Sequence, residues 1–80
     1  MKATVIVRLK REVLDVQGRA VERALGTLGF EGVRDVRIGK LIEIELGDQA
    51  AGPELEERLR RMCDELLANP VTEDYELRLG

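Results

Sequence analysis

The sequence predicts an α+β domain whose elements follow the order β-α-β-β-α-β. Two observations support this: apolar and polar residues alternate near both ends and in the middle of the chain, and two apolar stripes of helical spacing lie between those segments. Glycine or proline stands at most of the borders. At 80 residues the chain is expected to form one domain, residues 1–80.

The first strand and helix come from residues 3–28. Residues 3–10 alternate with a period of two, which predicts a half-buried strand. Asp15 can cap the following helix, because its side chain accepts free backbone N–H groups, and Gly29 can end it in the left-handed conformation. The apolar stripe of this helix consists of Ala20, Val21, Ala24, Leu25 and Leu28.

Two further strands are predicted over residues 33–38 and 41–46. Between them stand Gly39 and Lys40, which suit a tight type II′ hairpin because glycine tolerates a positive φ. For Gly39-Lys40, turn formation is a better interpretation than a ligand site.

The second helix and the last strand complete the pattern. Pro53 suits a first helical turn, and Asn69-Pro70 ends the helix because a residue before proline avoids the helical region. Residues 74–79 then alternate as a strand. The stripe of this helix consists of Leu55, Leu59, Met62, Cys63, Leu66 and Leu67. The elements predict a ferredoxin-like fold: a four-stranded antiparallel sheet in the order 4-1-3-2, with both helices on one face.

Such a sheet has an open face, and alternation makes that face polar. Arg8 and Lys10 of the first strand would have acidic neighbours on both sides, including Asp74 and Glu76. This face is either a solvated ladder of charges or a polar subunit interface, and both interpretations stay open.

Composition excludes several classes of protein. The net charge is −3 and there are two aromatic residues, Phe30 and Tyr75, so neither a basic stripe nor a stacking platform for nucleic acid is present. The chain has one cysteine and no histidine, which leaves no disulfide and no sulfur–nitrogen zinc site. No apolar run could span a bilayer, so a cytoplasmic protein is expected. A core this small favours self-association.

No candidate catalytic group has the setting that catalysis needs. Glu73, Asp74 and Glu76 lie on a strand of an open sheet, which offers no shielded cleft for paired carboxylates. Cys63 lies on an apolar stripe, and the chain has no histidine to activate it. After these exclusions, the remaining function class is a binding or assembly module.

Four segments resemble the PurS family, the small subunit of phosphoribosylformylglycinamidine synthase. They are Val13-Leu14-Asp15-Val16-Gln17-Gly18, Leu28-Gly29-Phe30, Val36-Arg37-Ile38-Gly39-Lys40 and the run from Met62 to Tyr75. The resemblance extends nearly from end to end. Val16 and Thr72 depart from it, since the family usually has Pro and Ile at these positions.

The resemblance implies a non-catalytic subunit that forms homodimers or tetramers. It would bridge a glutaminase subunit (PurQ) and a synthetase subunit (PurL) and support ammonia transfer between them. It would bind no cofactor itself, because ATP and Mg²⁺ are used by the synthetase. The candidate subunit-interface residues are Asp15, Gln17, Arg37, Lys40, Asn69, Glu73, Asp74, Tyr75 and Glu76. The alternative is a regulatory dimer that senses a small ligand, as ACT domains do.

Overall fold

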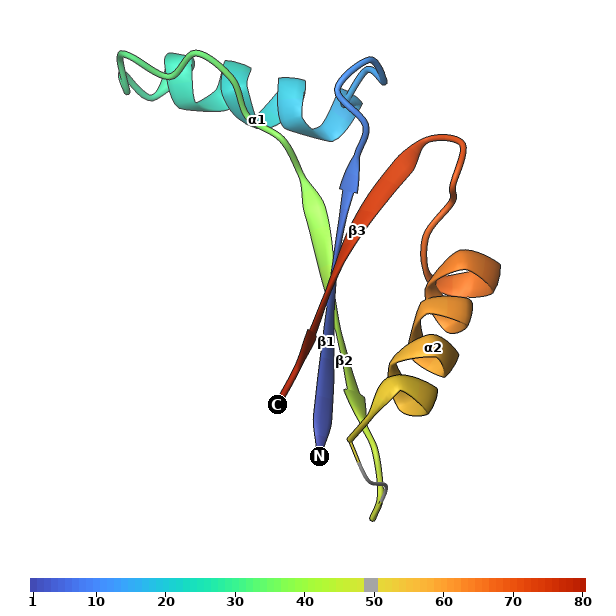
Figure 1. The fold of residues 1–80 in the computed structure, drawn as a ribbon. Coiled ribbons are helices and arrows are strands. Elements are labelled where there is room, and N and C mark those ends of the chain that lie inside the picture. The colour runs from blue at the N-terminus through green and yellow to red at the C-terminus, as the bar shows by residue number, and fades with distance from the viewer. Residues whose placement is uncertain (49–50) are drawn as a thin grey trace.

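A computed structural model describes residues 1–48 and 51–80 of the chain. Its elements are β1 Lys2–Leu9, α1 Val16–Thr27, β2 Gly39–Glu45, α2 Pro53–Met62, the π-helical turn η1 Cys63–Leu67, and β3 Glu73–Leu79. The strands form an antiparallel sheet in the order β2-β1-β3 (Figure 1). The fold is therefore α+β, as predicted.

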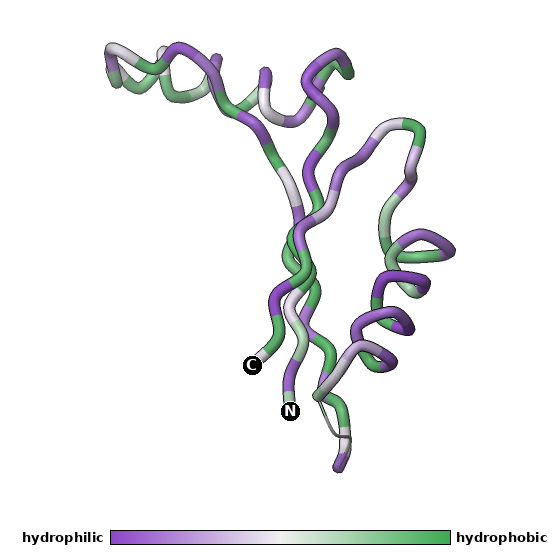
Figure 2. The backbone as a smooth tube through the Cα atoms, viewed as in Figure 1, coloured by the Kyte–Doolittle hydropathy of each residue, from purple (hydrophilic) through white to green (hydrophobic). Residues whose placement is uncertain are grey.

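The core lies between α2 and one face of the sheet. Ala3, Val5 and Val7 of the central strand are at most 1% exposed. They face Leu59 and Cys63, which are both fully buried. Apolar residues recur every second position in β1 and every three or four positions in the helical segment, so each element presents one apolar side to the other. Figure 2 shows hydrophobic residues along the strands of the sheet and at intervals along the mostly hydrophilic α2.

Helix α1 does not share this core. It projects beyond the end of the sheet and away from α2 (Figure 1). The Cα radius of gyration is 16.3 Å, whereas a compact chain of this length has about 12 Å. The prediction that both helices cover one face is therefore wrong for α1. We call residues 11–38, which carry this helix, the arm.

The predicted strand over 33–38 and the hairpin at Gly39-Lys40 are also wrong. Gly39 begins β2 and pairs with Arg8, so the pairing of β1 and β2 ends there. Residues 33–38 lie beyond that point, where the described chain offers them no strand partner. Among residues 1–48 and 51–80 the sheet has three strands rather than four.

The predictions at the borders of the elements are confirmed. Asp15 caps α1 through its side chain, Gly29 has a φ of 91°, and Pro53 is the first residue of α2. Each depends on contacts within a few residues, which is why local sequence is sufficient to predict it.

Candidate assembly site

The arm leaves the sheet through a junction organised by Asp15. Its carboxylate accepts hydrogen bonds from the backbone N–H of Gly18 at 2.8 Å and from that of Ile38 at 2.6 Å. The Asp15 residue is only 4% exposed. One side chain therefore joins the start of α1 to the segment that enters β2.

Two glycines let the backbone segments of this junction approach closely. A Cβ at Gly18 would lie 2.1 Å from the carbonyl oxygen of Val36, and a Cβ at Gly39 would lie 2.5 Å from that of Val7. Real Cβ atoms do not approach backbone atoms so closely, so both positions require glycine.

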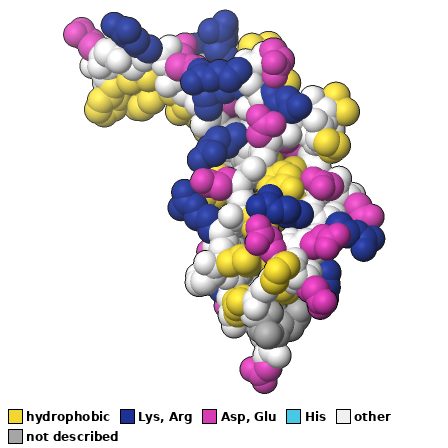
Figure 3. Space-filling model, in the orientation of Figure 1, with side chains coloured by type: hydrophobic (Ala, Val, Ile, Leu, Met, Phe, Trp, Pro, Cys, Tyr) yellow, Lys and Arg dark blue, Asp and Glu magenta, His cyan; other side chains and the backbone are white. Residues whose placement is uncertain are grey.

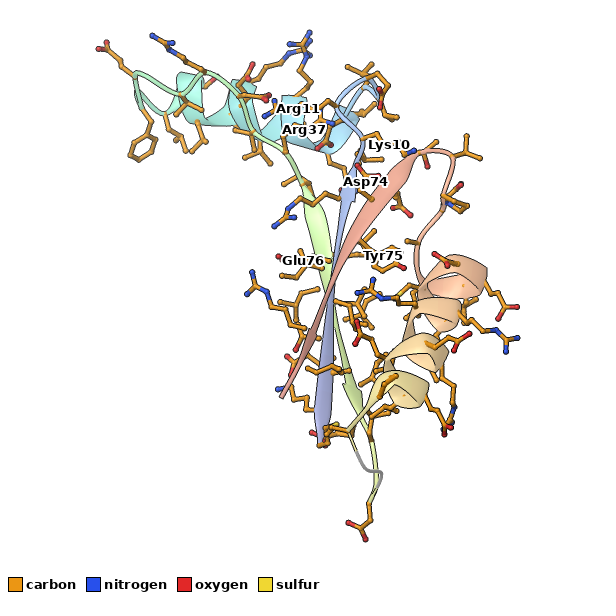
Figure 4. The ribbon with its side chains drawn as sticks, viewed as in Figure 1. Lys10, Arg11, Arg37, Asp74, Tyr75 and Glu76 are labelled. Carbon is orange, nitrogen blue, oxygen red and sulfur yellow. The ribbon has the colours of Figure 1, made fainter. Side chains whose placement is uncertain are left out.

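Arg37 links the segment before β2 to the chain between β1 and α1. Its guanidinium donates to the backbone carbonyls of Lys10 at 2.9 Å and Val13 at 3.2 Å. Figure 4 shows Arg37 beside Lys10 and Arg11 where the arm meets the sheet. Asp15 and Arg37 together hold the arm in its projecting direction.

Most of the predicted interface residues gather around two hollows at this junction. Asp15, Gln17, Lys40 and Glu73 line the first, of about 350 Å³, together with apolar side chains that include Leu14 and Val16. The second has a volume of about 280 Å³ and is lined by Arg8, Leu9, Arg11, Arg37, Asp74 and Tyr75. Seven of the nine candidates thus lie close to the junction.

The other two candidates have local roles. The side-chain oxygen of Asn69 accepts from the Val71 N–H at 3.0 Å, and the Asn69 N–H donates to Glu73 at 2.7 Å, so Asn69 shapes the turn before β3. Glu76 forms an ion pair with Arg78 at 3.0 Å.

The open face of the sheet carries the charges that alternation predicts. Asp74 lies opposite Arg8 in the strand register, and Tyr75 points to the α2 side. The neighbour of Arg8 on β2 is Gly39, however, so acidic neighbours on both sides of Arg8 are not found. The acidic residues of β2 lie further along, where Glu43 pairs with Lys2.

A large exposed apolar surface on the arm was not anticipated. Leu28 is 72% exposed, Phe30 59% and Val21 39%. Figure 3 shows hydrophobic side chains along one side of the arm and basic side chains along the other. The helical stripe in the sequence predicts an apolar helix face packed on the chain's own sheet, whereas the structure leaves much of that face exposed.

The described residues show no catalytic arrangement. Cys63 is fully buried, and burial raises the pKa of its thiol, so the nucleophilic thiolate is disfavoured. Among residues 1–48 and 51–80, no group of three or more histidine, cysteine or acidic side chains could hold a metal ion. No helix in the described part of the chain has the length and hydrophobicity to cross a membrane.

Asp15→Asn is expected to change how stability depends on pH. The N–H groups of Gly18 and then Ile38 hold the pKa of the Asp15 carboxyl below its ordinary value of 3.8. When the folded-state pKa of a carboxyl group is lower than its unfolded-state pKa, the carboxylate stabilises the fold at pH values above the unfolded-state pKa. This contribution disappears as the pH falls through the folded-state pKa. Urea unfolding should therefore show a deficit in the variant at pH 7 that shrinks below pH 3.8.

The matched control is Asp35→Asn, at an exposed position of the arm. It should follow the wild-type protein across this range. A constant difference between Asp15→Asn and the wild type from pH 7 to pH 3 would contradict the role given to the Asp15 carboxylate.

The fold and the site define a class of protein: a small α+β module with exposed apolar side chains on its arm and, in its described residues, no catalytic arrangement. The chain belongs to the PurS family, since the family model described as "PurS: Phosphoribosylformylglycinamidine (FGAM) synthase" matches residues 2–80.

Individual relatives agree with this assignment. The phosphoribosylformylglycinamidine synthase subunit PurS of Methanocaldococcus jannaschii is 44% identical over 78 residues, covering 98% of this chain and 93% of the relative. The Bacillus subtilis PurS structure superposes with a TM-score of 0.84 at 43% identity, covering 96% and 94% of the two chains. A chain in the structure of PurLQS from Thermotoga maritima gives a TM-score of 0.81 at 36% identity, covering 96% and 93%.

Proposed function

We propose that this chain is the assembly subunit of a phosphoribosylformylglycinamidine synthase. It joins a glutaminase subunit to a synthetase subunit and supports the passage of ammonia between them. The observation that supports this proposal most directly is that a relative of nearly equal length belongs to a PurLQS structure. The absence of a catalytic arrangement in residues 1–48 and 51–80 is consistent with this role. ATP and Mg²⁺ are used by the synthetase in this proposal, and the complex works in the cytoplasm.

The proposal includes self-association into a dimer or tetramer. A helix of 12 residues is only marginally stable by itself. The exposed stripe on α1 therefore needs a covering surface, and the junction directs it away from the chain's own core. Static light scattering should give a mass above that of the 9.0 kDa monomer, and a monomer at micromolar concentration would contradict self-association.

The assembly role can be tested by size-exclusion chromatography with the two larger subunits. Adding this chain should shift the glutaminase and the synthetase into one joint peak, and glutamine and nucleotide should strengthen it. Formation of the same joint peak without this chain would overturn the proposal. No observation favours the alternative of an ACT-like sensor, and no large thermal stabilisation by free amino acids is expected.

Neutral replacements at Asp74 and Glu76 are expected to weaken assembly. The two acids are exposed on the open face of β3, Asp74 at the junction and Glu76 two residues further along the strand. Exposed charges contribute mostly to association rather than to folding. In Asp74→Asn with Glu76→Gln the joint peak should need several-fold more protein, while the free synthetase keeps its ammonia-dependent activity. Glu54→Gln with Glu57→Gln, at exposed positions of α2, is the charge-matched control and should assemble normally.

A further inference from the structure

Strand β3 forms one edge of the sheet, and its outer side has no backbone partner within residues 1–48 and 51–80. The Lys10 N–H donates to the Thr72 carbonyl at 2.8 Å, one step beyond the pairing of β1 with β3. Because bonded and non-bonded pairs alternate in an antiparallel ladder, the even-numbered residues of β3 bond to β1. The N–H and C=O groups that point outward are therefore those of Tyr75, Leu77 and Leu79.

An unpaired edge can accept another strand through the same backbone hydrogen bonds. Proteins commonly protect such edges with a proline or a bulge. Strand β3 has no proline among its seven residues, and its pairing with β1 runs without a bulge. Its charged side chains restrict the choice of strand, because like charges directly opposite each other are destabilising.

The two faces of β3 have different character. Tyr75 and Leu77 pack against the core on the α2 side, and Leu79 follows on the same side at 39% exposure. Glu76 and Arg78 lie on the open face, where their side chains form an ion pair. Figure 4 shows Tyr75 and Glu76 on opposite sides of the strand. An added strand must therefore offer apolar residues to one face and an opposite pattern of charge to the other.

A second copy of β3 meets both requirements. When Leu77 lies opposite Leu77 of the other copy in an antiparallel pair, Tyr75 lies opposite Leu79, and Glu76 lies opposite Arg78. A two-fold axis repeats each of these pairs, so all of them are apolar or oppositely charged. The next bonded registers in the two directions place Glu76 opposite Glu76 or Arg78 opposite Arg78. The charges thus select one register.

The other edge of the sheet is not self-complementary in this way. The open face of β2 carries Gly39, Leu41, Glu43 and Glu45, and none of these is basic. A second copy of β2 would therefore set acidic side chains opposite acidic or uncharged ones. Self-pairing is a property of the β3 edge.

We propose that β3 of one copy pairs with β3 of a second copy, with Leu77 opposite Leu77, so that one continuous sheet runs through both. The outward N–H and C=O groups of Tyr75, Leu77 and Leu79 bond across the two-fold axis. No residue of the arm takes part, so this contact is compatible with a separate contact made by the arm. The inference rests on the self-association proposed above and assigns one of its surfaces to β3.

Charge reversal on the open face tests the register. Arg78→Glu sets Glu opposite Glu76 twice, and Glu76→Arg sets Arg opposite Arg78 twice. In sedimentation equilibrium each variant should weaken self-association by about tenfold or more. An equal mixture of the two variants should associate as the wild type does, because every cross-strand pair then has opposite charges again.

The mixture separates this contact from the ion pair within one strand. Mixing chains cannot repair the broken Glu76–Arg78 ion pair of a single chain, so an absence of rescue would overturn the proposal. The matched control is Glu65→Arg, which breaks the exposed Arg61–Glu65 ion pair with the same change of charge. This control should associate normally, and a weakening equal to that of Glu76→Arg would also overturn the proposal.

Amide hydrogen exchange locates the contact on the strand. The outward amides of Tyr75, Leu77 and Leu79 should be protected in the associated wild-type chain and should exchange rapidly in Arg78→Glu. Self-association with rapid exchange at these three amides would overturn the β3 contact and leave the assembly role intact. Protection that appears only after the glutaminase and synthetase subunits are added would assign this edge to a larger subunit and would equally overturn pairing between copies.

Discussion

Gly18→Ala is expected to weaken assembly severely although it adds a single methyl group. That group would lie 2.1 Å from the Val36 carbonyl oxygen and 2.8 Å from Oδ2 of Asp15. Both neighbours belong to the junction, so the arm must shift and the Asp15 hydrogen bonds must stretch. Overpacking of this kind destabilises a fold by about 1–3 kcal/mol. Sedimentation equilibrium should show at least about a tenfold weaker self-association, which corresponds to 1.4 kcal/mol.

Gly26→Ala is the matched control in the same helix. A Cβ at Gly26 has no atom within 4 Å, and alanine favours a helix over glycine by up to about 1 kcal/mol. This variant should associate as the wild type does and unfold at an equal or higher temperature. If Gly18→Ala behaved in the same way, the junction would not determine the direction of the arm.

Leu28→Ser with Phe30→Ser is expected to have the second large effect. These side chains are 72% and 59% exposed in the single chain, and the proposed assembly covers them. Full burial of one such side chain is worth about 1.5–3 kcal/mol. Losing both should raise the dissociation constant of the dimer by about 100-fold or more.

The control for this variant is Arg19→Ser with Arg23→Ser, at two positions of α1, which ends just before Leu28. It should leave the dissociation constant within a few-fold of the wild-type value. A double variant at Leu28 and Phe30 that still formed the wild-type oligomer, measured by light scattering across a dilution series, would rule out the arm as an association surface.

Local sequence was sufficient to predict the features that contacts between neighbouring residues determine. Asp15, Gly29 and Pro53 mark borders of helices through contacts within one turn, and the alternation in β1 matches its buried face. The place of α1 was not predictable in this way, because an amphipathic stripe indicates that a helix needs cover without saying which surface covers it. The strand predicted over 33–38 failed for a related reason, since β-forming residues need a partner strand.

The candidate site was predictable in part. The cap at Asp15 was predictable from its residue type, and the structure confirms it. The interface role that the resemblance implies for Asp15 and Arg37 stays a prediction, and both side chains lie at the junction. The close contacts of Gly18 and Gly39 could not be deduced, because glycine in a sequence does not reveal which backbone atoms approach it. Asn69 and Glu76 lie outside the two hollows, where their contacts are with their own turn and strand.

The glutamine-dependent turnover of the complex tests the central claim most directly. The glutaminase and synthetase subunits are assayed with and without this chain, with glutamine or with ammonium chloride as the nitrogen source. The assembly role predicts that adding the chain raises the glutamine-dependent rate strongly and barely changes the ammonia-dependent rate. Equal glutamine-dependent rates with and without the chain would contradict it.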